Sequence, residues 1–235
     1  MIWLFLWITS IFHAHHKHSI KKNKKKEEGR GIAYPPFLFT LNTHMKIEDV
    51  IDDSRQQEEY KILNERCLQF IIESQGYPLL KNLPITYGDF QKIKVRHRNE
   101  ELNELYTEAF DVRDLRRRAI FANGLTSFEP VYEELEPFYI FPINGFKFLY
   151  SKEVENSSQE YKQVFDVMYE NFGSEKGNEI IIDLLKFTYS SDKLHEGISN
   201  GSEIIIFNIP FYYAIRANTI ISYSALVEKI KNIDV

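Results

Sequence analysis

The chain has 235 residues, of which 43% are hydrophobic and 27% are charged, a balance typical of a soluble globular protein and not of a disordered chain, a collagen-like repeat or a polytopic membrane protein. Its single cysteine, Cys67, excludes an internal disulfide framework and a cysteine-based zinc site. The formal net charge of −5 is unevenly spread, because residues 1–31 carry +5 and the remainder carries −10.

Residues 1–33 are predicted to form a disordered tail, which begins with about 12 apolar residues and continues with a basic run. The apolar stretch is too short to cross a bilayer core of roughly 30 Å, and its basic residues follow it, unlike those of a signal peptide. Export and a peripheral membrane anchor through Trp3 and Trp7 remain open alternatives. The tail also holds four histidines, but a flexible cluster binds metal adventitiously, so we expect no metal site.

Residues 34–235 are predicted to form a single domain. Apolar spacing and capping residues predict helices over residues 46–74 (capped by Thr43), 100–110, 129–136, 156–169, 178–189 and 192–200, and a final helix capped by Ser224. Residues 79–89 are predicted to be a loop. Strands are predicted at residues 37–40, 90–95, 119–122, 138–142, 146–150, 203–207 and 211–215.

Two turns are predicted to close hairpins. Asn144-Gly145 lies between two aromatic runs, and Asn208 to Pro210 lies between the last two strands. Asn123-Gly124 is a third turn signal. Because the strands do not alternate regularly with helices, a doubly wound parallel sheet is disfavoured. The sequence therefore predicts an α+β fold, with a small, mainly antiparallel sheet and surrounding helices.

Common catalytic motifs are missing from the sequence. It contains no P-loop, no dinucleotide-binding glycine fingerprint, no zinc-protease motif and no nucleophile elbow. The negative charge of residues 32–235 disfavours nucleic-acid binding by the folded body. Any such binding, or contact with a membrane, would fall to the tail.

Three segments together suggest a site: the arginines 116–118 before a strand, Ser151 at the end of a middle strand, and Glu203 at the start of a late strand. This order resembles the arginine–serine–glutamate pattern of the ADP-ribosyltransferase fold. The resemblance implies NAD as cofactor. Arg118 would pair with its pyrophosphate, and Ser151 or Tyr150 would position the nicotinamide ribose.

The resemblance also implies that Glu203 stabilises the positive charge that develops as nicotinamide leaves, with Tyr150 or Tyr213 lining the cleft. The sequence departs from the family in two places. The second motif usually reads Ser-Thr-Ser, where this chain has Tyr150-Ser151, and many transferring members have a glutamate or glutamine where this chain has Gly201. Enzymatic activity is therefore an open question at this point.

A second resemblance covers residues 141–151, 198–206 and 212–215, which are similar to a group of uncharacterised tailed-bacteriophage proteins. It implies a viral origin, and with it the host cytoplasm, but no activity. The competing hypothesis is a non-enzymatic viral accessory or virion-associated protein that binds a host or capsid protein through an acidic, aromatic-rich surface. Oligomeric state is left open.

Each of these residues can also be explained by a role in stability alone, without any function. The arginines 116–118 lie near Asp111 and Asp114, and ion pairs on a helix surface would explain them. Residues 146–150 would simply pack in the core, and Glu203 would be a solvent-facing residue at the start of a strand. The two interpretations differ in whether Arg118, Ser151 and Glu203 converge on one cleft.

Overall fold

The computed structural model describes residues 54–97, 102–124, 134–151, 157–220 and 222–233. By compactness the chain divides into two units, Met1–Ile47 and Glu48–Val235, and all of the described residues belong to the second. The predicted tail, the strand at residues 37–40, the cap Thr43 and the domain start at residue 34 lie outside the described residues and stay predictions.

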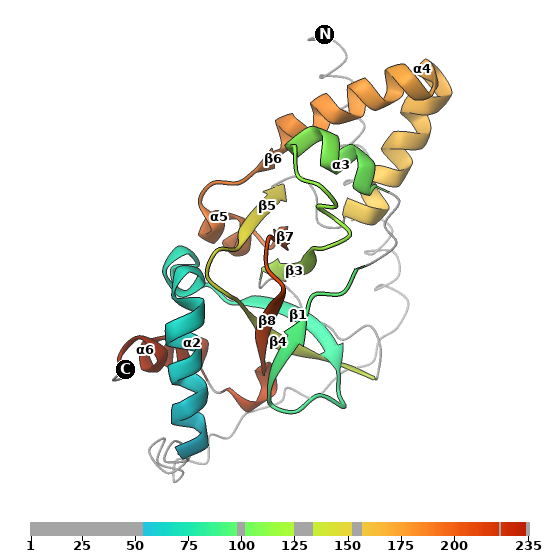
Figure 1. The fold of residues 1–235 in the computed structure, drawn as a ribbon. Coiled ribbons are helices and arrows are strands. Elements are labelled where there is room, and N and C mark those ends of the chain that lie inside the picture. The colour runs from blue at the N-terminus through green and yellow to red at the C-terminus, as the bar shows by residue number, and fades with distance from the viewer. Residues whose placement is uncertain (1–53, 98–101, 125–133, 152–156, 221, 234–235) are drawn as a thin grey trace, which may run out of the picture. The chain divides into compact units, whose positions relative to one another are not determined.

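The described part of the second unit is an α+β fold built on one antiparallel sheet, as the sequence predicts (Figure 1). The eight strands are ordered β2-β8-β4-β1-β3-β7-β5-β6, and every neighbouring pair is antiparallel. Their bounds are β1 Leu79–Pro84, β2 Phe90–Lys94, β3 Ile120–Gly124, β4 Leu135–Pro142, β5 Lys147–Ser151, β6 Tyr189–Ser190, β7 Glu203–Phe207 and β8 Phe211–Arg216.

The sheet consists of two four-stranded halves that meet at a short joint. One half is β2-β8-β4-β1 and the other is β3-β7-β5-β6. At the joint, the described residues of β1 and β3 pair at Leu79 with Gly124 and at Leu80 with Asn123. By contrast, β1 pairs with β4 through five residue pairs. Among the described residues, the two halves are therefore hydrogen-bonded over a short distance, and they also share one core cluster, which includes Leu79 and Phe138 of one half and Ala122 and Ile204 of the other.

Different helices pack on the two halves (Figure 1). α2 packs against α6 and β4, α5 packs on β3, β5 and β7, and α3 packs against α4. None of the described helices is long and apolar enough to cross a bilayer. The bounds are α2 Ser54–Glu73, α3 Asn103–Phe110, α4 Ser157–Thr188 with a break at Gly173, α5 Leu194–Ser199 and α6 Tyr223–Lys231; a short 3-10 turn, η2, spans Ala217–Thr219.

Successive side chains of β5 and β7 face different layers, as the two-residue period of a strand requires. Tyr150 and Ile204 belong to the core cluster that includes residues of α2 and α5. Leu149 and Ile205 are buried outside that cluster. Ser151 shares their face, which is the side of α3 and α4, because its partner in the register is Tyr189, whose ring contacts both of those helices.

Gly124, at the joint, permits the close approach of α5. A Cβ atom on Gly124 would lie 1.8 Å from the carbonyl oxygen of Ile198, and a backbone atom cannot turn aside as the end of a side chain can. The Gly124 N–H also donates to the carbonyl of Ser202 at 3.3 Å. The sequence suggested a turn at Asn123-Gly124, but both residues lie in β3, and packing is what requires the glycine.

Asn144 joins the β4–β5 connection to α2. Its backbone N–H donates to the Arg66 carbonyl at 2.7 Å, and its side-chain amide donates to the Glu65 carbonyl at 3.1 Å. Its side-chain oxygen accepts from the Gln69 N–H at 2.9 Å. These bonds lie where α2 departs from helical geometry, at Cys67 (φ −123°, ψ 15°). The turn therefore satisfies backbone groups that an interrupted helix leaves without helical partners.

Both predicted hairpins are wrong in their pairing, although their strands are present. β4 pairs with β1 and β8, whereas β5 pairs with β6 and β7. The two strands flanking Asn144-Gly145 therefore lie in different halves of the sheet. In the same way β7 and β8 are not neighbours. Turn residues indicate where the chain changes direction, but they do not decide which strands pair. In this sheet, strands that are distant in the sequence form the hydrogen bonds that the predicted hairpin partners would have formed.

Three local predictions are also corrected. Residues 79–84, predicted to be loop, form β1, whose leucines are buried between β4 and β3. The predicted helix at residues 129–136 is contradicted at its described end, because Leu135 begins β4. Ser222, not Ser224, caps α6, since its Oγ accepts from the Ala225 N–H at 3.4 Å.

Gly124→Ala is expected to lower the free energy of unfolding by about 2–3 kcal/mol, because the new methyl group overlaps the Ile198 backbone and forces α5 away from the joint. Urea denaturation measures the change. Gly88→Ala is the matched control: its Cβ would meet only the end of the Gln91 side chain, which can move. Equal midpoints for the two variants would show that the close approach does not limit stability.

Candidate functional site

A cleft of about 580 Å³ lies where three connections of the chain come together. One wall is formed by residues 95–97 after β2, the second by the β7–β8 connection at residues 207–210, and the third by residues 112–118 between α3 and β3. Lys147, the first residue of β5, completes the lining. Connections supply these walls because they leave the sheet at the strand ends, where side chains are not packed on both faces.

Basic side chains dominate the polar lining of this cleft. Arg113, Arg118, Lys147 and His97 all line it, and all four are exposed residues. Asp114 supplies the carboxylate of the lining, and it is paired with Arg117 at 3.4 Å. The cleft therefore carries an excess of positive charge within a chain of net negative charge, and this attracts anionic ligands.

The remaining lining is largely apolar. Phe207 and Ile209 are buried residues on the β7–β8 wall, and Val95, Leu115 and Pro210 add to it. An apolar wall beside convergent cations suits a ligand that has a flat or apolar body and one or more negative groups. Nucleotides have this construction.

The three consecutive arginines have three different environments. Arg116 is completely buried. Arg117 pairs with Glu104 at 3.2 Å and with Asp114 at 3.4 Å. Arg118 is exposed and lines the cleft. The three arginines therefore have three roles in the structure: Arg116 is a buried anchor, Arg117 forms ion pairs, and Arg118 is a candidate ligand contact.

Arg116 holds the cleft-forming connection against α3 and β3. Its guanidinium carbon lies 4.6 Å from the ring centroid of Tyr106 and 4.6 Å from that of Phe121, a cation–π arrangement on two rings. The Tyr106 hydroxyl donates to the Tyr189 hydroxyl at 2.8 Å. Burial raises the pKa of both tyrosines, and the positive charge of Arg116 partly offsets the rise in the pKa of Tyr106.

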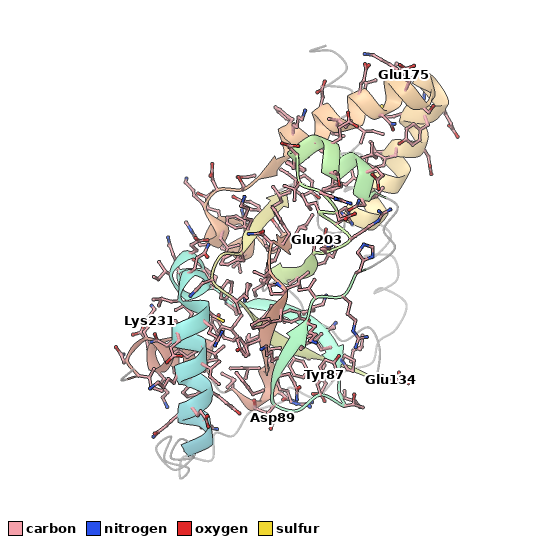
Figure 2. All side chains as sticks on the ribbon, in the orientation of Figure 1. Tyr87, Asp89, Glu134, Glu175, Glu203 and Lys231 are labelled. Atoms are coloured by element: carbon pink, nitrogen blue, oxygen red, sulfur yellow. The ribbon has the colours of Figure 1, made fainter. Side chains whose placement is uncertain are left out.

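Ser151 and Glu203 are brought together by the sheet. Tyr150 pairs with Ile204 across β5 and β7, so Ser151 and Glu203 are opposite each other at the next position and face the same side. Ser151 is buried, whereas Glu203 is partly exposed. Figure 2 shows Glu203 below α3, and its negative charge raises the pKa of Tyr106 and of Tyr189.

Arg118 lies away from this pair. Ile120 pairs with Ile206 and Asn123 pairs with Glu203, so Arg118 precedes the end of β3 that is farther from Glu203. Three residues of strand already separate those ends by about 10 Å. The cleft and the Ser151–Glu203 pair therefore lie toward opposite ends of the same strands.

The two predicted tyrosines also lie apart from Glu203. Tyr150 is buried on the opposite face of β5, where Gly197 of α5 would touch its ring if it had a Cβ. Tyr213 is in β8, and three strands separate β8 from β7, which at the usual spacing of adjacent strands is roughly 19 Å. Of the five predicted residues, the sheet thus brings together Ser151 and Glu203.

Sequence reasoning missed Lys147, Arg113 and His97 as members of a common cleft. Lys147 was visible as the one charged residue in an aromatic strand, which marks a position facing away from the core. Nothing in the sequence placed it in the same cleft as Arg118, because that arrangement depends on the pairing of β5 with β7 and of β7 with β3.

Comparison with protein-family models, with curated proteins and with solved structures found no match. The resemblances to ADP-ribosyltransferases and to tailed-bacteriophage proteins, and the host or virion partner, therefore stay predictions. Within the described ranges, no group of three or more His, Cys, Asp or Glu side chains is placed to hold a metal ion, and the four tail histidines lie outside those ranges.

The buried tyrosines predict a loss of stability at alkaline pH. An unfolded tyrosine loses its proton near pH 10, whereas the folded chain keeps those of Tyr106 and Tyr189 because their pKa is raised. The unfolded state then binds fewer protons, so the free energy of unfolding falls as the pH rises above about 10. Urea titrations between pH 8 and 11 measure the fall.

Tyr106→Phe should make this fall smaller, because one raised pKa is removed. Tyr77→Phe is the control, since Tyr77 is 44% exposed and should leave the fall unchanged. An unchanged fall in Tyr106→Phe would contradict the assignment to the buried tyrosines.

Proposed function

We propose that this protein binds a phosphate-bearing nucleotide in the cleft formed by residues 95–97, 112–118, 147 and 207–210. One observation carries the proposal: Arg118, Arg113, Lys147 and His97 line the same cleft together with an apolar wall. NAD is the candidate ligand, because the resemblance to ADP-ribosyltransferases implies it and assigns Arg118 to its pyrophosphate.

The cleft's chemistry suits such a ligand. Arg118 offers a planar fork of donors for two phosphate oxygens, and Lys147 offers a compact point charge. Because both side chains are exposed, their attraction for an anion is screened by salt. The wall that includes Phe207 provides an apolar surface for the base or ribose. Binding is therefore expected to weaken with ionic strength and to require both parts of the ligand.

Calorimetric titration with NAD, AMP and inorganic phosphate tests the proposal. We expect NAD and AMP to bind more tightly than phosphate, because phosphate cannot use the apolar wall. Arg118→Ala with Lys147→Ala should weaken NAD binding by roughly tenfold or more, the effect of losing charge-assisted hydrogen bonds. Lys186→Ala, an exposed lysine of α4, is the matched control. Equal affinity in all three proteins, or no binding by the wild type, would overturn the proposal.

A second candidate function is cleavage of NAD at its nicotinamide–ribose bond, and it is favoured by the adjacency of Ser151 and Glu203 on β5 and β7. In this reaction the C–N bond breaks, nicotinamide leaves with the bonding electrons, and water or an acceptor adds to the ribose carbon and releases a proton. A carboxylate stabilises the positive charge on the ribose. Ile205, which lies between Phe207 and Glu203 on this face of β7, is buried, so NAD would have to approach Glu203 from its own partly exposed side and not along β7 from the cleft. Cleavage is therefore tested separately from binding.

Release of nicotinamide, followed by chromatography, tests this second candidate. Glu203→Gln should reduce the release by roughly a hundredfold, because the neutral amide does not stabilise the cation, while NAD affinity in the cleft stays within about twofold. Glu196→Gln in α5 is the control for loss of a partly exposed carboxylate. Equal turnover by wild type and Glu203→Gln would rule out the role of Glu203.

A further inference from the structure

The cleft is continuous with the outer edge of the sheet. Val95 and Pro210 line the cleft, and the Val95 N–H donates to the Pro210 carbonyl at 2.9 Å. One residue further out on each chain, Lys94 pairs with Phe211 in the β2–β8 ladder. The two chains that form one wall of the cleft therefore run directly into the edge strand and its neighbour.

One face of this edge carries cations beside aromatic rings. Residues that pair across β2 and β8 share a face, and so do residues two apart on one strand, which places Phe90, Lys92, Lys94 and Phe211 together. Both lysines are exposed, and both phenylalanines are partly exposed. The Lys92 ammonium lies 4.0 Å from the centroid of the Phe211 ring. Arg96 is also exposed. The cleft-lining Val95 faces the other side of the strand from Lys94, so a ligand that leaves the cleft reaches the lysines by passing around the outer edge of β2.

The backbone of β2 adds donors to the same edge. The Val95–Pro210 bond and the bond from the Arg216 N–H to the Asp89 carbonyl fix the alternation of the ladder. In an antiparallel pair, both the N–H and the C=O groups at positions 90, 92 and 94 then point away from β8. Because β2 ends the strand order of the described sheet, these N–H donors face outward beside Lys92 and Lys94, in alternation with the carbonyl acceptors.

Two acidic side chains of the described residues beside the edge and the cleft, Asp89 and Asp114, form ion pairs. Asp89 accepts from Arg216 at 2.9 Å, and Asp114 is paired with Arg117. Other carboxylates gather elsewhere: Figure 2 shows Glu175 at the outer bend of α4, far from Asp89, and α4 also carries exposed Asp166, Glu170, Glu179 and Asp183. The net charge of the chain therefore does not describe this surface.

We infer that the edge formed by Phe90, Lys92, Lys94, Arg96 and Phe211 extends the cleft into a binding track for single-stranded nucleic acid. The inference rests on the proposed function, since the cleft holds one nucleotide of the strand. Lys92 and Lys94 are two residues apart, about 6.6 Å along a strand, which is similar to the spacing of phosphates in an extended single strand. Cations follow the backbone and aromatic rings contact bases in such tracks.

Fluorescence anisotropy with a labelled twelve-nucleotide single strand, as DNA and as RNA, tests the inference, with AMP as the mononucleotide. We expect the twelve-mer to bind at least tenfold more tightly than AMP. Lys92→Ala with Lys94→Ala should remove most of that gain and lower the number of phosphate contacts in the salt dependence by about two. AMP affinity should stay within about twofold. Lys186→Ala with Lys231→Ala, two exposed lysines of α4 and α6, is the matched control and should change neither.

The outcomes separate the inference from the proposal beneath it. AMP binding with a twelve-mer that binds no more tightly overturns the track and leaves the cleft in place. Equal displacement of the twelve-mer by polyglutamate of the same charge also overturns the track, because it shows a surface for any polyanion. No AMP binding at all overturns the nucleotide cleft itself.

Discussion

The fold depends on how closely α5 can approach the joint between the two halves of the sheet. The described residues of β1 and β3 share two residue pairs there, so backbone hydrogen bonds between these residues join the halves over a short distance. Gly124 has no side chain, and this lets the Ile198 carbonyl of α5 lie where a Cβ would otherwise be. On the same helix, Gly197 leaves room for the ring of Tyr150. The two glycines place α5 against β3 and β5, and the relative position of the strands that border the cleft follows from that packing.

A buried charge fixes the position of one wall of the cleft. Arg116 has no exposed surface and lies between the rings of Tyr106 and Phe121, so the connection from α3 to β3 is fixed at its centre. Arg113 and Arg118, on either side of that anchor, line the cleft. The polar cluster around Tyr106 and Tyr189 is thus a support for the site, and its buried hydroxyls stay protonated because burial raises their pKa.

Most of the strands and helices were predictable from the sequence, but their partners were not. Continuous runs of β-favouring residues identified β7 and β8 correctly, since that signal is local. The predicted hairpin pairings were wrong because each strand pairs with strands that are distant in the sequence. β8 lies between β2 and β4, and β7 lies between β3 and β5. The candidate site was predictable only in part. Ser151 and Glu203 are neighbours because β5 pairs with β7. Arg118 instead lines a cleft whose walls come from connections between strands and helices, and such connections have no periodic signal in the sequence.

The lysines of β2 have a consequence beyond any ligand. An edge strand with free backbone groups is a template for pairing with a second molecule, and lysines on such a strand normally prevent that association. Within the described sheet β2 is such an edge strand, and it carries Lys92 and Lys94 with the partly exposed Ile93 between them. Neutralising their charge, whether by substitution or by a tightly held polyanion, removes the repulsion between copies. The two side chains that the proposed track uses are therefore also those that oppose pairing of this edge with a second copy.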